Sequence, residues 1–136
     1  MKITRSNELV AYTPGGHYDV RAQRIHNKEI SGTEMLTVGL SWFLPGGRAD
    51  ANVTAEGCET VYYIVEGEMT LEANGETTLL KAGDSALFKA GDVRAVGCQT
   101  GGNRLSDPAG AADDHGFLPF KGKKFVQFSA HIVISF

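Results

Sequence analysis

Four glycines stand at equal steps of eight residues in the middle of the chain: Gly67, Gly75, Gly83 and Gly91. Glycine accepts a positive φ, which a tight turn between antiparallel strands requires. A helix with glycine at this interval would lose about 1 kcal/mol at each position. The rhythm therefore predicts short antiparallel strands that turn at glycine, and it argues against a helical protein.

The segments between and around these glycines have the composition of strands. They are rich in β-branched and aromatic residues, and several alternate apolar with polar positions. Asn74-Gly75 is a strong hairpin signal, and residues 45–47 (Pro-Gly-Gly) predict the end of a strand. The expected strands cover residues 17–26, 35–44, 60–66, 69–72, 77–80, 85–88, 93–96 and 125–136. We expect an all-β fold, an antiparallel β-sandwich or barrel.

Length and composition favour one folded domain over residues 1–136. Hydrophobic residues make up 42% of the 136 residues, enough for a core. The 17 glycines follow no triplet repeat, which excludes collagen. Residues 99–124 lack a strand pattern, and we expect a loop or a short helix there, with Asp107 as N-cap and Gly116 as its end.

Charge and cysteine content narrow the class of protein further. The 13 basic and 16 acidic residues give a net charge of −3 without a basic stripe, so we expect no nucleic-acid partner. No segment approaches the roughly 20 apolar residues of a membrane helix, and we expect no membrane partner. The first residues lack the apolar stretch of a signal peptide. Two cysteines are too few for a framework of disulfide bonds. These features predict a cytoplasmic protein.

The stretch from residue 47 to residue 98 resembles the cupin family. The first cupin motif runs Gly, five residues, His-x-His, three or four residues, Glu, six residues, Gly. Here Gly47 is followed after five residues by Val53-x-Ala55, then after four residues by Thr60 and after six by Gly67. The spacing fits without a gap.

The second cupin motif runs Gly, five residues, Pro-x-Gly, two residues, His, three residues, Asn. Here Gly83 is followed after five residues by Lys89-x-Gly91, then by Arg94 and Cys98 at the matching steps. The resemblance implies a jelly-roll barrel, with strands outside 47–98 completing it.

Cupins usually hold a divalent metal with the two His and the Glu of the first motif and the His of the second. Those positions here carry Val53, Ala55, Thr60 and Arg94. Val and Ala offer no donor atom, and a guanidinium is a cation without a lone pair to give. We therefore expect no metal and no cofactor.

The resemblance places Arg94 in the barrel interior, together with one face of the strand around Tyr62. Side chains two residues apart share a strand face, so Thr60 and Ile64 accompany Tyr62. A buried arginine needs a partner. That partner is either an anionic ligand or a protein carboxylate, the candidates being Glu59, Glu56 and Asp50.

Three residues are candidates for proton transfer: Glu59, beside the family's Glu position, Tyr62, and His17 at the start of a strand. The alternatives are a solvated glutamate, a packing tyrosine and a loop histidine. The ligand-binding candidates are Arg94, Thr60, Tyr63 and Trp42. The partner they imply is a small molecule.

Two functions follow from these residues. The first is a metal-independent enzyme of the isomerase, lyase, decarboxylase or cyclase type, acting on a small anionic or aromatic metabolite by acid/base chemistry. The alternative is a non-catalytic sensor or carrier. A metal-dependent enzyme is the third and least favoured interpretation. Small cupins pair through an N-terminal strand, so the resemblance also implies a homodimer, which would cover open sheet edges.

Overall fold

The computed structural model describes residues 1–98 with their side chains and the backbone of residues 125–133. The helix expected within residues 99–124 and the end of the last strand, residues 134–136, lie outside the described residues. Within the described part, no helix is long and apolar enough to cross a membrane.

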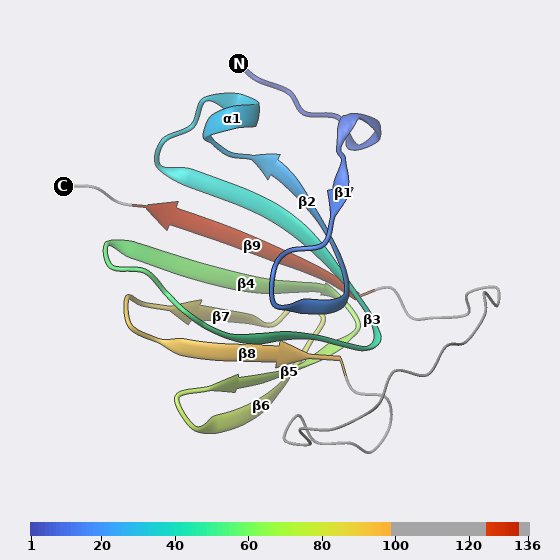
Figure 1. Ribbon diagram of the computed structural model, residues 1–136, viewed down its shortest axis with the longest axis vertical. Helices are drawn as coiled ribbons and strands as arrows, with labels where there is room; N and C mark the ends of the chain where they lie inside the picture. Colours follow the sequence, from blue (N-terminus) through green and yellow to red (C-terminus); the bar gives the residue numbers. More distant parts are fainter. Residues whose placement is uncertain (99–124, 134–136) are drawn as a thin grey trace.

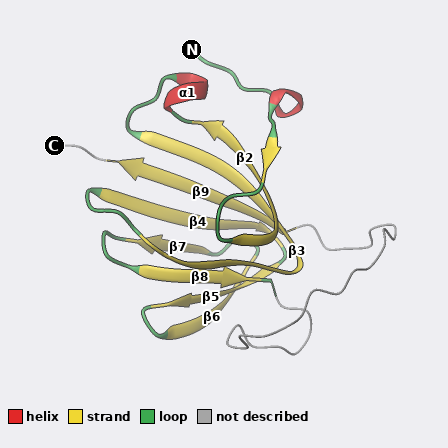
Figure 2. Ribbon diagram, in the orientation of Figure 1, coloured by secondary structure: helices red, strands yellow, loops and turns green. Residues whose placement is uncertain are grey.

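Strands dominate the molecule, which confirms the all-β prediction (Figures 1 and 2). The two short helical turns are η1 (Ser6–Glu8) and α1 (Lys28–Ser31). The strands are β1 (Ala11–Tyr12), β2 (His17–His26), β3 (Leu36–Val53), β4 (Cys58–Glu66), β5 (Glu68–Ala73), β6 (Glu76–Lys81), β7 (Ser85–Phe88), β8 (Val93–Gly97) and β9 (Phe125–Val133).

All the strand pairs are antiparallel, in the order β6-β5-β8-β3-β9-β4-β7. Strand β2 joins β3, and β1 joins β2. Residues 36–43 of β3 pair with β9, and residues 48–53 pair with β8. This long strand therefore belongs to both halves of the sandwich, and it bends between them (Figure 1).

The expected strand end at residues 45–47 is wrong, because β3 continues through them. Gly46 has a φ of 81° and donates its N–H to the carbonyl of Cys98 over 3.0 Å. The N–H of Cys98 in turn donates to Gly47 over 2.8 Å. A Cβ on Gly47 would stand 2.6 Å from the carbonyl oxygen of Asp19. The glycines here bend the strand and admit a close neighbour without ending it.

The evenly spaced glycines are turn corners, as predicted. Gly67, Gly75, Gly83 and Gly91 have φ values of 85°, 84°, 93° and 88°. Asn74 also has a positive φ, 51°, so Asn74 and Gly75 form the two central residues of the β5–β6 hairpin. Positive φ at both positions is the signature of a type I′ turn.

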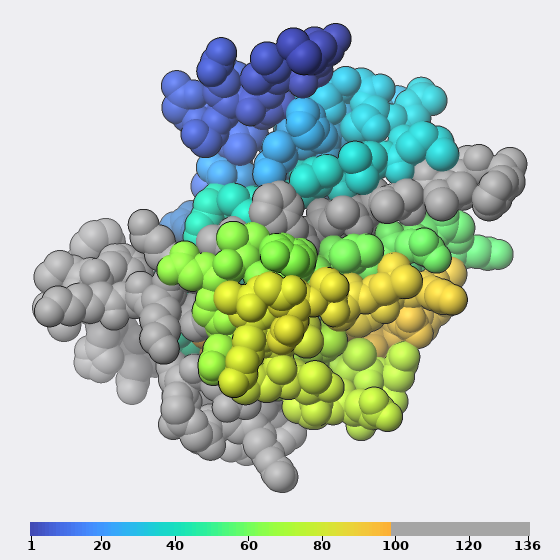
Figure 3. Space-filling model, turned by 180° about the vertical axis from the view of Figure 1, so that it is seen from behind, coloured from blue at the N-terminus to red at the C-terminus, as the bar shows by residue number. Residues whose placement is uncertain are grey.

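The core lies between the two layers of strands. It is built from the inward-facing apolar residues Val20, Phe43, Ala49, Ile64, Met69, Leu71, Leu80, Phe88, Val96 and Cys98. Seen from behind, the N-terminal residues (blue) occupy one end of the molecule, and the strands from β4 to β8 (green to orange) occupy the other (Figure 3). The core fills only part of the interior, and a polar cavity occupies the rest.

Candidate ligand-binding cavity

A shift in strand register decides which residues of β3 face the cavity. The pairing of β3 with β8 slips between Ala49 and Asn52, so Asn52 stands opposite Arg94. Because side chains alternate along a strand, a one-residue slip exchanges the two faces. Asn52 lines the cavity, whereas Val53 is 56% exposed.

The residues around the end of β3 that approach Arg94 therefore lie one position earlier in the sequence than the expected Val53 and Ala55. Thr54 is buried and contacts Arg94, whereas Ala55 is exposed. The positions that line the cavity or contact Arg94 are thus Asn52 and Thr54, whereas Val53 and Ala55 are exposed and do neither. The contiguous spacing of the sequence motif does not reveal the bulge that causes this change.

Arg94 is the centre of the cavity's polar wall, and only 4% of its surface is exposed. Its Nε donates to the Tyr62 hydroxyl over 2.9 Å, and one terminal nitrogen donates to the Thr54 hydroxyl over 2.6 Å. The guanidinium carbon lies 5.0 Å from the centre of the Phe88 ring and 5.2 Å from that of Tyr62. Neutral hydroxyls and aromatic faces thus surround this cation.

The expected ion pair of Arg94 with a nearby carboxylate is wrong for the described residues. Within residues 1–98, Glu59, Glu56 and Asp50 form no salt bridge with Arg94. Asp50 instead lies 3.9 Å from Arg48. A guanidinium has five N–H donors, and two of these are used by Tyr62 and Thr54. Donor capacity is therefore left for a ligand.

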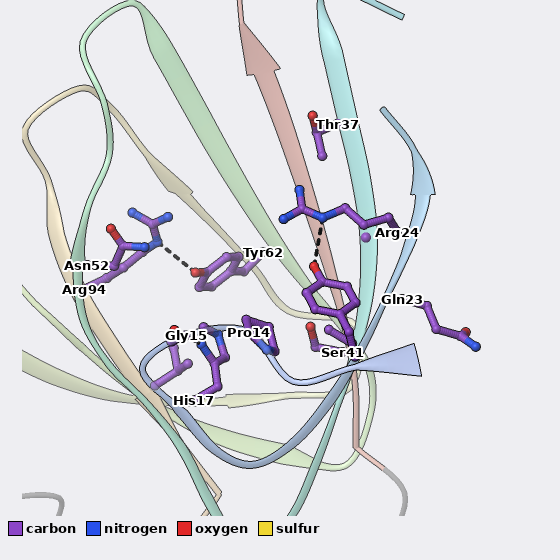
Figure 4. Close-up of a pocket in the computed structure, with 14 residues that line it drawn as sticks. Pro14, Gly15, His17, Gln23, Arg24, Thr37, Ser41, Asn52, Tyr62 and Arg94 are labelled. Carbon is purple, nitrogen blue, oxygen red and sulfur yellow. Dashed lines mark hydrogen bonds between the residues drawn. The ribbon is translucent and has the colours of Figure 1, made fainter. Parts of the chain in front are cut away.

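The cavity beside Arg94 has a volume of about 420 Å³ (Figure 4). Its lining residues come from β1, β2, β3, β4, β8 and the loop before β2: Tyr12, Pro14, Gly15, His17, Ala22, Gln23, Arg24, Thr37, Gly39, Ser41, Asn52, Tyr62, Arg94 and Val96. Most of these side chains are hydroxyls, amides or cations. Among the described residues, none of the lining side chains is a carboxylate.

His17 contributes a titratable group to the same cavity. It is the first residue of β2 and is half-buried. Its ring Nδ1 lies 2.9 Å from the carbonyl oxygen of Gly15. Because a carbonyl only accepts hydrogen bonds, this contact places a proton on Nδ1 and leaves Nε2 for proton exchange. The fold thus brings together three expected site residues: His17, Tyr62 and Arg94.

Four other expected site residues do not line the cavity. Glu59 and Tyr63 alternate with Tyr62 along β4 and so lie on its opposite face. Trp42 likewise alternates with the lining residue Ser41 on β3. Thr60 faces inward but is wholly buried in the core. The site is therefore smaller than the sequence suggested, and it lacks these four residues.

Several residues of the site were not expected from the sequence, among them Asn52, Thr54, Tyr12 and Arg24. The first two depend on the bulge in β3. Tyr12 lies in a strand of only two residues, too short for any periodicity to show. Arg24 carries a sequence signal only as a polar residue in β2, which does not say which face it takes.

The fold and the cavity define a β-sandwich with a polar cavity, and comparisons with known proteins show which family it resembles. Residues 39–103 match the family model described as the cupin domain. Over these residues, which make up just under half of the chain, the sequence is similar to the cupin domain, and the fold is cupin-like.

Three known proteins illustrate the similarity. The beta-D-galactosidase Rv1717 of Mycobacterium tuberculosis is 38% identical over 71 residues, which span 52% of this chain and 60% of the relative. A Thermotoga maritima structure described as a predicted oxalate decarboxylase has a TM-score of 0.68 at 20% identity, covering 98% of this chain and all of the other. The polyketide cyclase RemF of Streptomyces resistomycificus has a TM-score of 0.70 at 14% identity, covering 98% and 80%. The two structures share the fold.

The residues at the family's metal position do not fit a divalent metal. The described residues contain no group of three or more His, Cys, Asp or Glu side chains placed to hold a metal ion. Arg94 occupies the interior with a fixed positive charge, and its neighbours Thr54 and Asn52 are poor metal ligands. Cys98, where the second motif has Asn, is buried, and this burial raises the pKa of its thiol. A raised pKa disfavours the thiolate that would bind metal.

Proposed function

We propose that this cupin-like protein binds a small, hydroxylated organic anion in the cavity and moves protons on it without a metal. The observation that carries the proposal is Arg94, a nearly fully buried cation whose described hydrogen-bond partners are two neutral hydroxyls. An isolated buried charge costs several kcal/mol. A ligand carboxylate would offset that cost, and a planar guanidinium suits it because the two form paired hydrogen bonds.

The rest of the lining favours a ligand with many oxygen atoms. Thr37 and Ser41 contribute hydroxyls to the lining, and Asn52 contributes an amide. Such groups donate to and accept from the hydroxyls of a ligand. A volume of about 420 Å³ suits a molecule the size of a small metabolite.

Tyr62 and His17 are the groups proposed to move protons. The Tyr62 hydroxyl accepts a hydrogen bond from Arg94 and still has its own proton to donate. His17 presents Nε2 as the complementary acid or base. Isomerase, lyase, decarboxylase and cyclase reactions need proton transfer and charge stabilisation of this kind.

A non-catalytic sensor or carrier is the second candidate, and the lining favours it in one respect. The described lining residues include no carboxylate, so His17 and the tyrosines are the lining groups left to transfer protons. The lack of a lining carboxylate among the described residues also argues against a galactosidase activity for this protein like that of the Mycobacterium tuberculosis relative. Most glycoside hydrolases use a pair of carboxylates at the scissile bond.

Binding is tested with two molecules that differ in one group, the carboxylate D-gluconate and the neutral alcohol D-glucitol. We expect gluconate to raise the melting temperature of the wild type and glucitol to leave it unchanged. In Arg94→Gln the gluconate shift should disappear. An equal gluconate shift in wild type and Arg94→Gln would overturn the role of Arg94 as the anion anchor.

Catalysis is tested with Tyr62→Phe, which keeps the ring and removes the proton. We expect the wild type to exchange the hydrogen next to the carboxylate of a bound hydroxy acid for deuterium, followed by NMR in D₂O. The variant should bind the acid but exchange it more slowly by about 10²- to 10⁴-fold. Binding without exchange in the wild type would favour the carrier over the enzyme.

A further inference from the structure

A second pair of arginine and tyrosine lines the same cavity. The Nε of Arg24, on β2, donates to the hydroxyl of Tyr12, on β1, over 2.8 Å. The guanidinium carbon lies 5.5 Å from the centre of the Tyr12 ring. Both residues line the cavity that contains Arg94. Arg24 and Arg94 approach this space from opposite sides, with Tyr62 between them (Figure 4).

The two pairs are built alike. In each, Nε is held by a tyrosine hydroxyl, over 2.9 Å at Arg94 and 2.8 Å at Arg24. Holding Nε fixes the guanidinium plane and leaves the terminal nitrogens for another partner. The pairs differ in depth, because Arg94 is 4% exposed and Arg24 is exposed to solvent.

The charged residues described in the lining of this cavity, Arg24 and Arg94, are both positive. Within residues 1–98, neither Arg24 nor Arg94 takes part in a salt bridge, and no described lining residue is acidic. Two cations around one cavity raise its positive potential. A ligand with a single negative group balances one of them, whereas a ligand with a negative group at each end balances both.

We propose that the cavity binds a dianion, with one anionic group held at depth by Arg94 and the other held at the mouth by Arg24. The inference rests on the proposed function and adds a substrate class to it: a hydroxylated chain with two anionic ends. The contact with Tyr12 preorganises Arg24, so little conformational entropy is lost when the second group binds.

The test compares three six-carbon probes by calorimetry: D-glucitol, D-gluconate and D-glucarate. They carry no, one and two carboxylates on similar chains. We expect the wild type to bind glucarate roughly tenfold more tightly than gluconate at low salt, as charge-assisted hydrogen bonds allow. Because Arg24 is exposed, this preference should shrink as the salt concentration rises. D-Gluconate 6-phosphate tells whether a phosphate serves as the second group.

Arg24→Gln is the diagnostic variant, and Arg21→Gln is its matched control. Arg21 is an exposed arginine on the same strand that does not line the cavity. We expect Arg24→Gln to bind glucarate and gluconate equally, and Arg21→Gln to keep the preference for glucarate. Arg24→Lys should retain part of the salt-dependent preference, which a loss of folding would not produce.

The outcomes separate this inference from the proposed function. Gluconate binding without any preference for glucarate, or a preference that survives in Arg24→Gln, would overturn the second anion site alone. Absence of gluconate and glucarate binding in the wild type would overturn the proposed function and the second site with it.

Discussion

Arg94 is a buried cation, and its removal would leave the buried Thr54 hydroxyl without its donor. Its partners Thr54 and Tyr62 satisfy part of its hydrogen-bonding capacity but none of its charge. Ligand binding should therefore depend on the charge of Arg94, whereas the stability of the fold should depend on its hydrogen bonds. A variant that removes the charge separates the two.

The first prediction concerns the coupling between Arg94 and Thr54. Arg94→Met should lower the free energy of unfolding by about 1–2 kcal/mol, because it leaves the buried Thr54 hydroxyl without its donor. Adding Thr54→Val should restore stability to within about 1 kcal/mol of wild type, since apolar groups of similar shape replace a buried polar contact well. Urea denaturation of both variants measures this.

The exposed residue Thr77 provides the control, because Thr77→Val should change stability little in either background. If Thr54→Val lowers the stability of Arg94→Met still further, the hydroxyl has another buried role and this account of Arg94 is wrong.

For single residues, the sequence predicted the side-chain direction where a strand has no bulge, because side chains there alternate regularly between the two faces. The cupin resemblance implied that Tyr62 and Arg94 face the interior, and both line the cavity. Asn52 and Thr54 were missed because one inserted residue reverses the faces of β3. Of the two partners considered for Arg94, a carboxylate is not found among residues 1–98, because Glu59 lies on the opposite face of β4 from Tyr62.

The turns connect hairpins that are distant in the sequence. The Asp92 carboxylate accepts from the backbone N–H of Lys89 over 2.7 Å and from the Asn74 side chain over 3.0 Å. The Asn74 side-chain oxygen accepts from the N–H of Val93 over 3.3 Å. The β5–β6 turn is thereby tied to the turn before β8, a contact that glycine spacing alone does not predict.

The second prediction follows from the Asp92 carboxylate. The Lys89 N–H, and then the Asn74 side chain, hold its pKa below the ordinary 3.8. A lowered pKa means that folding favours the ionised form, so the stabilisation is present above the unfolded pKa and is lost as the pH falls through the folded value. Asp92→Ala should therefore melt at a lower temperature than wild type at about pH 5–8.

The difference in melting temperature between Asp92→Ala and wild type should narrow below about pH 4, where the carboxylate becomes protonated. Thermal melts followed by circular dichroism across the range test this. A difference that widens on acidification would show that the carboxylate does not stabilise the turn in its ionised form.

At the scale of the molecule, the sheet has edges that no other described strand covers. Within the described part, β1 pairs only with β2, β6 only with β5, and β7 only with β4. Unpaired edges invite further strands unless another chain or segment covers them.

The third prediction is that the protein is a homodimer. Light scattering after size-exclusion chromatography at micromolar concentration should give about twice the 14.6 kDa of one chain. Ala11→Pro in β1 should weaken the dimer if the N-terminal strand forms the contact, because proline removes a backbone donor. A wild-type monomer at that concentration would contradict the prediction.

Strand β3 also determines how the protein can open. It supplies Thr37 and Ser41 from the part paired with β9, and Asn52 from the part paired with β8. No single hairpin can detach and leave the rest of this wall intact, since the same strand crosses both layers. The β3 backbone amides that exchange hydrogen most slowly should therefore do so only when the whole protein unfolds. The cavity and the fold should then be lost together, in one cooperative transition.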